Sequence, residues 1–417
     1  MVNSIKAYEK LLILFLSINN FSYAFDLRQI GVGTVSLSKK AKQYVNEVLE
    51  SNRLTYGPFL QTFEKQFGKL HNAKFTLVSN SGTSSLQIAL QTLKEIHNWQ
   101  DGDEVLVPTV TFVATSNIVI HNNMVPVFVD VETDFYEIDP TLIEQKITPR
   151  TKAIIPVHLF GLPCDMDPII ELAKKYNLKI IEDSCECMFA TYKNKSVGTL
   201  GDIGCFSTYA AHILSTGVGG LSTTNNPEYA MMMRSLLNHG RDSIYISIDD
   251  DDNKSESEMK EIIARRFKFI KIGHSFRMTE LEGAIGVAQL EDWENIINKR
   301  RANADYLTQN LKKLENFIQL PKIRPDCTHS FMMYPIVLKY ESKTDFVNYL
   351  EKYGIETRDM LPLINQPIYQ ERFNIKPGDY PVADWINANG FYIGCHQDLT
   401  QEDLDYMIQI ASAYFEK

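Results

Sequence analysis

The chain has 417 residues, a formal net charge of −10 and a sequence pI of about 5.5. Hydrophobic residues make up 44% and charged residues 23%, the balance of a globular protein with ample material for a core. A net negative charge is not typical of nucleic-acid-binding proteins, which carry basic patches. Six cysteines in a chain of this length do not form a disulfide scaffold, so we expect reduced thiols.

The N-terminal segment, residues 1–28, is an extension in our domain division. Lys6 and Lys10 precede the apolar run 11–18, and Ser22-Tyr23-Ala24 follows it. This order resembles a signal peptide, but the run is far too short for a membrane span. An extension, or a helix packed on a partner subunit, is the alternative. The chemistry predicted downstream favours the cytoplasm over secretion.

From residue 38 onward, helices alternate with short apolar strands. Continuous apolar strands separated by helices indicate a mostly parallel sheet covered on both faces, that is, an α/β fold. Such sheets bind ligands at the carboxyl ends of their strands. Helices are predicted over 38–51, 63–71 and 86–97, and strands over 76–78, 104–107, 126–129, 153–157 and 179–181.

The second half of the chain predicts a smaller unit. The acidic stretch 249–253 is typical of an exposed insertion. We expect a large domain over residues 29–295 and a smaller C-terminal α+β domain over residues 296–417. The elements that support this division are helices over 281–293 and on to 314, a strand over 334–338, and helices over 343–353 and 401–415.

Two strand ends carry residues suited to a phosphate and a flat ring. The run 80–85 consists of asparagine, glycine and hydroxyl residues and leads into a helix, which suits a phosphate at a helix N-terminus. A plain helix cap is the alternative. Phe112 follows the next strand, where it can stack on a planar ring. A core phenylalanine is the alternative there.

Two further strand ends complete the pattern. Asp183 follows an apolar strand, and a buried carboxylate is costly unless a cation meets it. A protonated pyridine nitrogen is such a cation and would keep the ring an electron sink; a metal or a structural ion pair is the alternative. Ser207 ends another strand, and Gly219-Gly220 lets the backbone turn sharply beside a ligand. Together the four segments predict a pyridoxal-phosphate pocket.

The order of these motifs resembles the DegT/StrS family of nucleotide-sugar aminotransferases. The resemblance implies a fold-type I pyridoxal-phosphate-dependent transferase with a large, mostly parallel seven-stranded sheet, a nucleotide-sugar substrate, and a homodimer with shared active sites. It covers roughly residues 30–415. The motifs are NSGTSSL (80–86), PTVTFVAT (108–115), the strand ending in ED (182–183), GDIGCFSTYAAHILSTGVGG (201–220) and GHSFRMTELEGAIGVAQL (273–290).

The resemblance also implies roles for single residues. Gly82, Thr83 and Ser207 would hold the cofactor phosphate. Phe112 would stack on the ring, and Asp183 would pair with the pyridine nitrogen.

Two more cofactor contacts fall on positions where this chain departs from the family. Glu186 stands where the family usually has glutamine, on the ring-hydroxyl side. Ser275 stands where the family usually has an asparagine that reaches the phosphate of the neighbouring subunit.

The main departure is at His212. In the aminotransferases, a lysine five residues after the strand-end serine tethers the cofactor as a Schiff base. Here that position is His212, and Gly219-Gly220 keeps the register. Histidine cannot form a stable imine with an aldehyde, but its unperturbed pKa of about 6.5 lets it move protons.

Within the family, a lysine-to-histidine change resembles the sugar 3-dehydratases, which use pyridoxamine phosphate. The stretch 390–394 (GFYIG) also resembles theirs. We expect His212 to remove a proton while a nucleotide-linked 4-keto-6-deoxyhexose loses its C3 hydroxyl, in deoxysugar or surface-polysaccharide biosynthesis.

Three alternatives to this interpretation remain. One is an aminotransferase-like enzyme with a non-covalently held cofactor, and another is a non-catalytic sugar-binding homologue. The third, a dehydrase with an iron–sulfur cluster, is disfavoured because only Cys327 and Cys395 follow His212, and no metal site is predicted.

Overall fold

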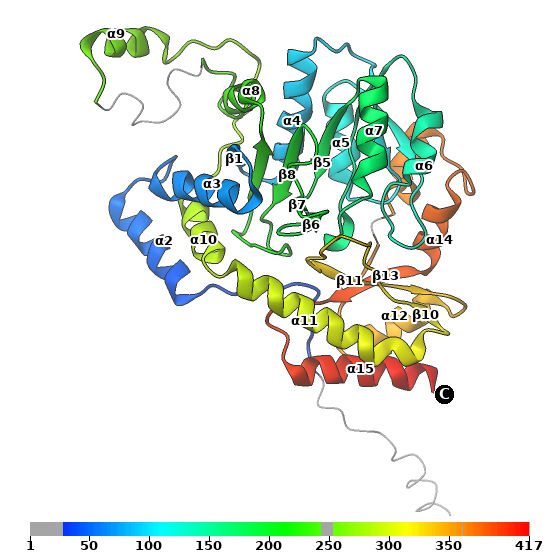
Figure 1. The fold of residues 1–417 in the computed structure, drawn as a ribbon. Helices are drawn as coiled ribbons and strands as arrows, with labels where there is room; N and C mark the ends of the chain where they lie inside the picture. Colours follow the sequence, from blue (N-terminus) through cyan, green and yellow to red (C-terminus); the bar gives the residue numbers. More distant parts are fainter. Residues whose placement is uncertain (1–27, 243–252, 361, 417) are drawn as a thin grey trace, which may run out of the picture.

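The computed structural model describes residues 28–242, 253–360 and 362–416. A seven-stranded sheet lies at the centre of its larger part, in the order β1-β9-β8-β5-β4-β2-β3 (Figure 1). Neighbouring strands are parallel, except that β9 runs antiparallel to both β1 and β8. The predicted α/β fold with a mostly parallel sheet is confirmed. The strands are β1 (Phe75–Ser79), β2 (Glu104–Pro108), β3 (Val125–Val129), β4 (Thr151–Ile154), β5 (Lys179–Asp183), β8 (Ile203–Ser207) and β9 (Gly220–Thr224).

Alternation along the strands sends side chains into two separate layers. Val105 and Val107 of β2 pack in the larger core, whereas Leu106 between them packs in a second cluster. Ile181 and Ile180 of β5 divide in the same way, because successive strand side chains point to opposite faces. Helices α4 (Gly82–Ile96), α5 (Val113–His121) and α8 (Pro227–Leu237) pack in the first layer, and α7 (Met166–Tyr176) packs in the second.

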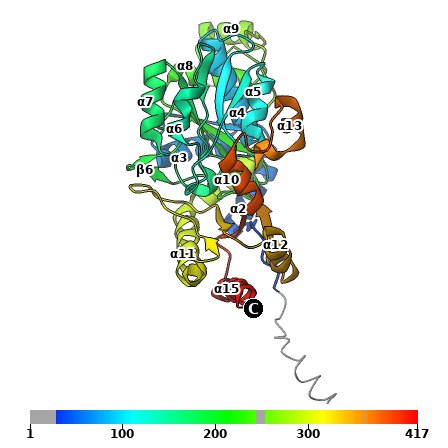
Figure 2. The same ribbon diagram turned by 90° about the vertical axis from the view of Figure 1, so that its right-hand side faces the viewer.

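A four-stranded antiparallel sheet, ordered β10-β11-β13-β12, belongs to the smaller part of the molecule. Both views place α11 and α15 together at the end remote from α8 and from α9 (Glu256–Arg265) (Figures 1 and 2). The proposed domain boundary at residue 295 falls inside α11. The elements here are β10 (Ile318–Gln319), β11 (Met333–Leu338), β12 (Thr357–Asp359), β13 (Gly390–Gly394), α11 (Trp293–Leu311), α12 (Lys343–Lys352), α13 (Pro367–Phe373), α14 (Pro381–Asn389) and α15 (Gln401–Phe415).

Two helices begin earlier than the sequence pattern predicts. Helix α4 begins at Gly82 rather than at residue 86, because the Ser81 hydroxyl accepts a hydrogen bond from the Ser84 N–H (3.1 Å) and caps it. Helix α3 (Pro58–His71) begins five residues early, because the Glu280 carboxylate accepts the Gly57 N–H at 2.9 Å. The remaining elements are α2 (Lys39–Ser51), α6 (Pro140–Ile143), α10 (Glu280–Leu290), β6 (Thr191–Tyr192) and β7 (Lys195–Ser196).

Two of the predictions fall on residues that are not described. The signal-like segment lies within residues 1–27, and most of the acidic stretch lies within residues 243–252, so both are outside the described residues. In the part of the chain that the structure describes, no helix has the length and apolar character to cross a membrane.

Candidate active site

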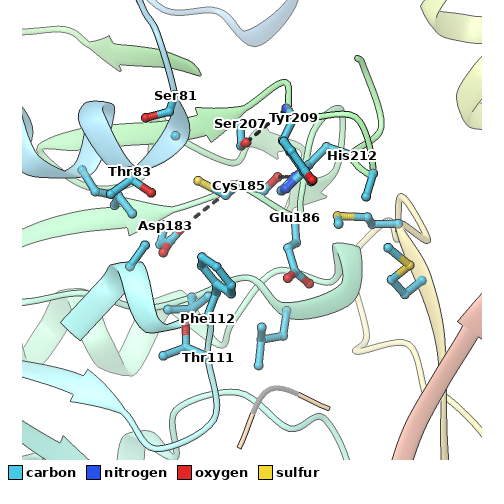
Figure 3. A pocket seen from close by; sticks show the side chains of 18 of the residues that line it. Ser81, Thr83, Thr111, Phe112, Asp183, Cys185, Glu186, Ser207, Tyr209 and His212 are labelled. Carbon is cyan, nitrogen blue, oxygen red and sulfur yellow. Dashed lines mark hydrogen bonds between the residues drawn. The ribbon is translucent and has the colours of Figure 1, made fainter. Parts of the chain in front are cut away.

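A cavity of about 350 Å³ opens where β2, β5 and β8 end (Figure 3). This is the sheet edge at which the strand pattern predicts a ligand. Seven of the eight predicted site residues line this cavity: Gly82, Thr83, Phe112, Asp183, Glu186, Ser207 and His212.

One end of the cavity is built for an anion. The N–H groups of Gly82 and Thr83 lie in the first turn of α4 and have no intrahelical acceptor. The Thr83 hydroxyl has no hydrogen-bond partner among the described residues. Ser207 Oγ accepts the Tyr209 N–H at 3.3 Å, so its own hydrogen is available to a ligand. A phosphate is the anion that these N–H and O–H donors at a helix N-terminus suit.

The backbone at Gly82 approaches the floor of the cavity closely. A Cβ at this position would lie 2.7 Å from Ser207 Cβ and 2.8 Å from Cys185 Sγ. Only glycine allows the first turn of α4 to come this near to the end of β8, so its N–H groups reach the cavity.

Phe112 is the flat wall of the cavity. It precedes α5 and is 57% exposed, so the alternative of a core phenylalanine is wrong. Its ring lies across the cavity from Ser207 and His212 (Figure 3). An exposed aromatic ring on a cavity wall is suited to stacking on a planar ligand.

Asp183 is a buried carboxylate at the end of β5. It is 4% exposed, and burial raises its pKa. Its oxygens accept the Thr115 hydroxyl at 2.8 Å and the Cys185 N–H at 3.2 Å. Among the described residues, no lysine or arginine pairs with it and no metal-ligating cluster forms, so both alternatives for this residue lack support. A pyridinium N–H would provide the missing positive charge.

The neighbouring acid, Glu182, points to the other face of β5 and has a structural role. Its carboxylate accepts the N–H groups of Gly198, Leu200 and Gly201 at 2.6–2.8 Å. It also accepts a hydrogen bond from His158 Nε2 at 3.1 Å. Because these donors satisfy Glu182, Asp183 is the acid of this pair that is available to a ligand.

His212 lies in the loop between β8 and β9, and its Nδ1 is 2.6 Å from the carbonyl oxygen of Cys185. A carbonyl oxygen only accepts, so Nδ1 carries the hydrogen and Nε2 keeps its lone pair. Burial lowers the pKa of His212 to about 4, which makes the ring neutral at pH 7. None of the described residues that line the cavity is a lysine.

The loop that carries His212 is closed by contacts of its own. The hydroxyls of Thr208 and Thr216 lie 2.6 Å apart, and the Ala210 N–H bonds to the Gly217 carbonyl at 3.1 Å. These contacts join the two ends of the loop that carries His212.

Glu186 and Tyr392 line the side of the cavity that faces the smaller sheet. Glu186 Oε2 accepts the Phe160 N–H at 3.2 Å, and burial raises the pKa of Glu186 to about 7. Tyr392 lies in β13, and the sequence reasoning missed it as a site residue. The only signal was the stretch 390–394, which contains it.

Ser275 does not line this cavity. Its hydroxyl accepts a hydrogen bond from Arg277 Nη2 at 3.0 Å, and its backbone pairs with Asn238. Its role at the phosphate of a neighbouring subunit stays a prediction.

The seven-stranded sheet, with a cavity at the carboxyl ends of its strands, has the architecture of the fold-type I pyridoxal-phosphate proteins. The model of the DegT/DnrJ/EryC1/StrS aminotransferase family matches residues 35–411, and the chain belongs to this family. The predicted family, fold type, enzyme class and cofactor class are thereby confirmed.

Three similar proteins illustrate the range of the family. A GDP-perosamine synthase of Caulobacter vibrioides is 34% identical over 388 residues, which cover 92% of this chain and 97% of the relative. A GDP-4-keto-6-deoxy-D-mannose 3-dehydratase of Escherichia coli O55:H7 is 28% identical, covering 88% and 95%. The solved structure of an aminotransferase from Psychrobacter cryohalolentis has a TM-score of 0.82 and 28% identity, covering 91% and 98%.

Proposed function

We propose that this protein removes the C3 hydroxyl from a nucleotide-linked 4-keto-6-deoxyhexose, with pyridoxamine phosphate as cofactor. The observation that carries this proposal is His212: it is a neutral base in a cavity without a lysine among its described lining residues. A base at the position of the tether suits proton removal and does not suit covalent retention of the cofactor.

In this proposal, different residues of the cavity bind the cofactor and transfer the proton. When bound, the cofactor supplies an amine that condenses with the keto group and a carbon acid that a base can deprotonate. Gly82, Thr83 and Ser207 hold its phosphate, Asp183 meets its ring nitrogen, and Phe112 covers one face. Nε2 of His212 then accepts a proton, because Nδ1 is committed to the Cys185 carbonyl.

We also propose an oligomeric state and a cellular location for the enzyme. It acts as a homodimer in the cytoplasm, and Ser275 of each chain contacts the cofactor phosphate of the neighbouring subunit. The chain has a large domain over residues 29–295 and a small domain over residues 296–417.

A second candidate function is amino transfer to the sugar with a non-covalently held cofactor. The identity of 33–34% to two GDP-perosamine synthases, against 28% to the dehydratases, favours it. A non-catalytic sugar-binding homologue is less consistent with the helix N-terminus at Gly82 and the buried carboxylate of Asp183, which suit a cofactor.

Product analysis separates these functions. The protein is incubated with pyridoxal phosphate, glutamate and a panel of GDP-, CDP-, dTDP- and UDP-linked 4-keto-6-deoxyhexoses. Dehydration gives a 3-deoxy ketosugar and one ammonia per glutamate consumed, whereas amino transfer gives an amino sugar and no ammonia. Turnover should be lost in His212→Asn and kept in His121→Asn, which changes a histidine outside the cavity. An amino sugar as the sole product would refute dehydration.

A further inference from the structure

Two carboxyl groups share one cavity, and their surroundings differ. Asp183 accepts hydrogen bonds from the Thr115 hydroxyl and the Cys185 N–H. Glu186 accepts one bond, from the Phe160 N–H. Two like charges in one low-dielectric space disfavour double ionisation, so Asp183, which accepts more hydrogen bonds, keeps the charge, and Glu186 holds its proton up to a pKa of about 7.

The other groups that face Glu186 do not compensate a negative charge. Tyr392 of β13 faces it, and burial together with the Glu186 carboxylate raises the pKa of this phenol. Asp183 raises the pKa of Glu186 further, beyond the effect of burial. Of the other lining groups, His212 is neutral, burial raises the pKa of the Cys185 thiol, and Tyr209 adds a phenol. Among the described lining residues there is no arginine or lysine, and Leu159, Met332 and Met333 make an apolar wall.

Below about pH 7, a protonated acid and a neutral base therefore line the same cavity. Loss of a hydroxyl needs both, because hydroxide is a poor leaving group unless it is protonated. Pairs of titratable groups whose environments push their protonation in opposite directions mark acid and base roles.

We propose that Glu186 is the general acid that protonates the departing C3 hydroxyl, while His212 is the base. This inference rests on the proposed dehydration. The base Nε2 takes the proton from carbon, and the electron pair of that C–H bond enters the new double bond. The C3–O bond breaks with its pair on oxygen, which takes the Glu186 proton and leaves as water. One proton passes from His212 through solvent to Glu186 and restores both groups.

The test compares two leaving groups in the wild type and in Glu186→Gln. The substrates are the 4-keto-6-deoxyhexose nucleotide that the wild type accepts and its 3-deoxy-3-fluoro analogue, from which fluoride leaves without a proton. We expect Glu186→Gln to lower kcat about 100-fold or more for the hydroxyl substrate and less than about tenfold for fluoride release. The matched control is Glu144→Gln, a change at an exposed acid that pairs with Lys175 and should leave both rates unchanged.

Equal loss on both substrates would overturn the assignment, since a merely structural role slows both. Infrared spectra of the cofactor-free protein give a second measurement that is independent of turnover. The carboxylic-acid C=O band that is missing from the spectrum of Glu186→Gln belongs to Glu186. In the wild type, this band should be present at pH 6 and lost by pH 9. A band absent at pH 6 would overturn the inference. A wild type that turns over neither substrate refutes the dehydration and leaves this spectral outcome to decide the protonation of Glu186.

Discussion

Replacing Asp183 with asparagine should weaken cofactor binding, because we propose that its buried carboxylate meets the ring nitrogen of the cofactor. A hydrogen bond to a charged group contributes about 1.5–3 kcal/mol. No lysine is among the described residues that line the cavity, so we expect no covalent bond to the cofactor, and the whole loss should appear in the dissociation constant. We therefore expect Asp183→Asn to raise the Kd for pyridoxal phosphate about 10- to 150-fold.

In the cofactor-free protein, we expect the same substitution to leave the free energy of unfolding unchanged or to raise it. Burial raises the pKa of Asp183, so the folded protein bears a cost for this carboxylate when no cation meets it. The asparagine keeps one acceptor for Thr115 or the Cys185 N–H. The free energy of unfolding without cofactor should therefore stay within about 1 kcal/mol of wild type, or rise.

Equilibrium dialysis and urea unfolding, with and without cofactor, measure both quantities. Asp167→Asn is the control, because Asp167 is an exposed acid that pairs with Lys193. A Kd that changes less than about threefold would show that Asp183 does not meet the ring nitrogen. A large loss of stability in the cofactor-free variant would instead assign the residue a structural role.

Three further changes test other parts of the structure. His212→Lys should create an absorbance band of an imine with pyridoxal phosphate and raise amino transfer; an unchanged spectrum would show that residue 212 does not reach the aldehyde. Gly82→Ala should lower the unfolding free energy by about 1–3 kcal/mol and weaken cofactor binding, because its Cβ would lie 2.7 Å from Ser207 Cβ; wild-type Tm and Kd would contradict this contact. His71 is fully buried with a pKa lowered to about 4, so the unfolded chain binds its proton first as pH falls below about 6.5. Urea unfolding should therefore show that wild type loses about 2–3 kcal/mol more than His71→Asn between pH 7 and pH 4.5, and equal losses would refute this.

The strand-end rule predicted most of the site from the sequence. Residues after β1, β2, β5 and β8 meet because carboxyl ends of parallel strands share one edge. The start of α4 was missed by four residues, because it depends on where the Ser81 hydroxyl points, and periodicity does not report that.

The sequence pattern could not predict contacts between segments that are far apart in the chain. Tyr392 reaches the cavity from the smaller sheet, and a residue's place in the chain does not reveal such a contact. The sequence also did not reveal that Glu182 is hydrogen-bonded within the fold, whereas Asp183 is available to a ligand. Alternation says that they face opposite ways, but only the three N–H groups around Glu182 show which of them is already satisfied.

The contacts within the loop around His212 bear on how cofactor occupancy depends on the supply of vitamin B6. The hydroxyls of Thr208 and Thr216 join the two ends of the loop. If the proposed function holds, a coenzyme without a covalent tether would dissociate and rebind between turnovers. Occupancy then follows mass action, and a coenzyme level 100 times its Kd would add about 2.7 kcal/mol to the unfolding free energy. Vitamin B6 starvation would thus lower both the catalytic rate in the cell and the lifetime of the folded protein.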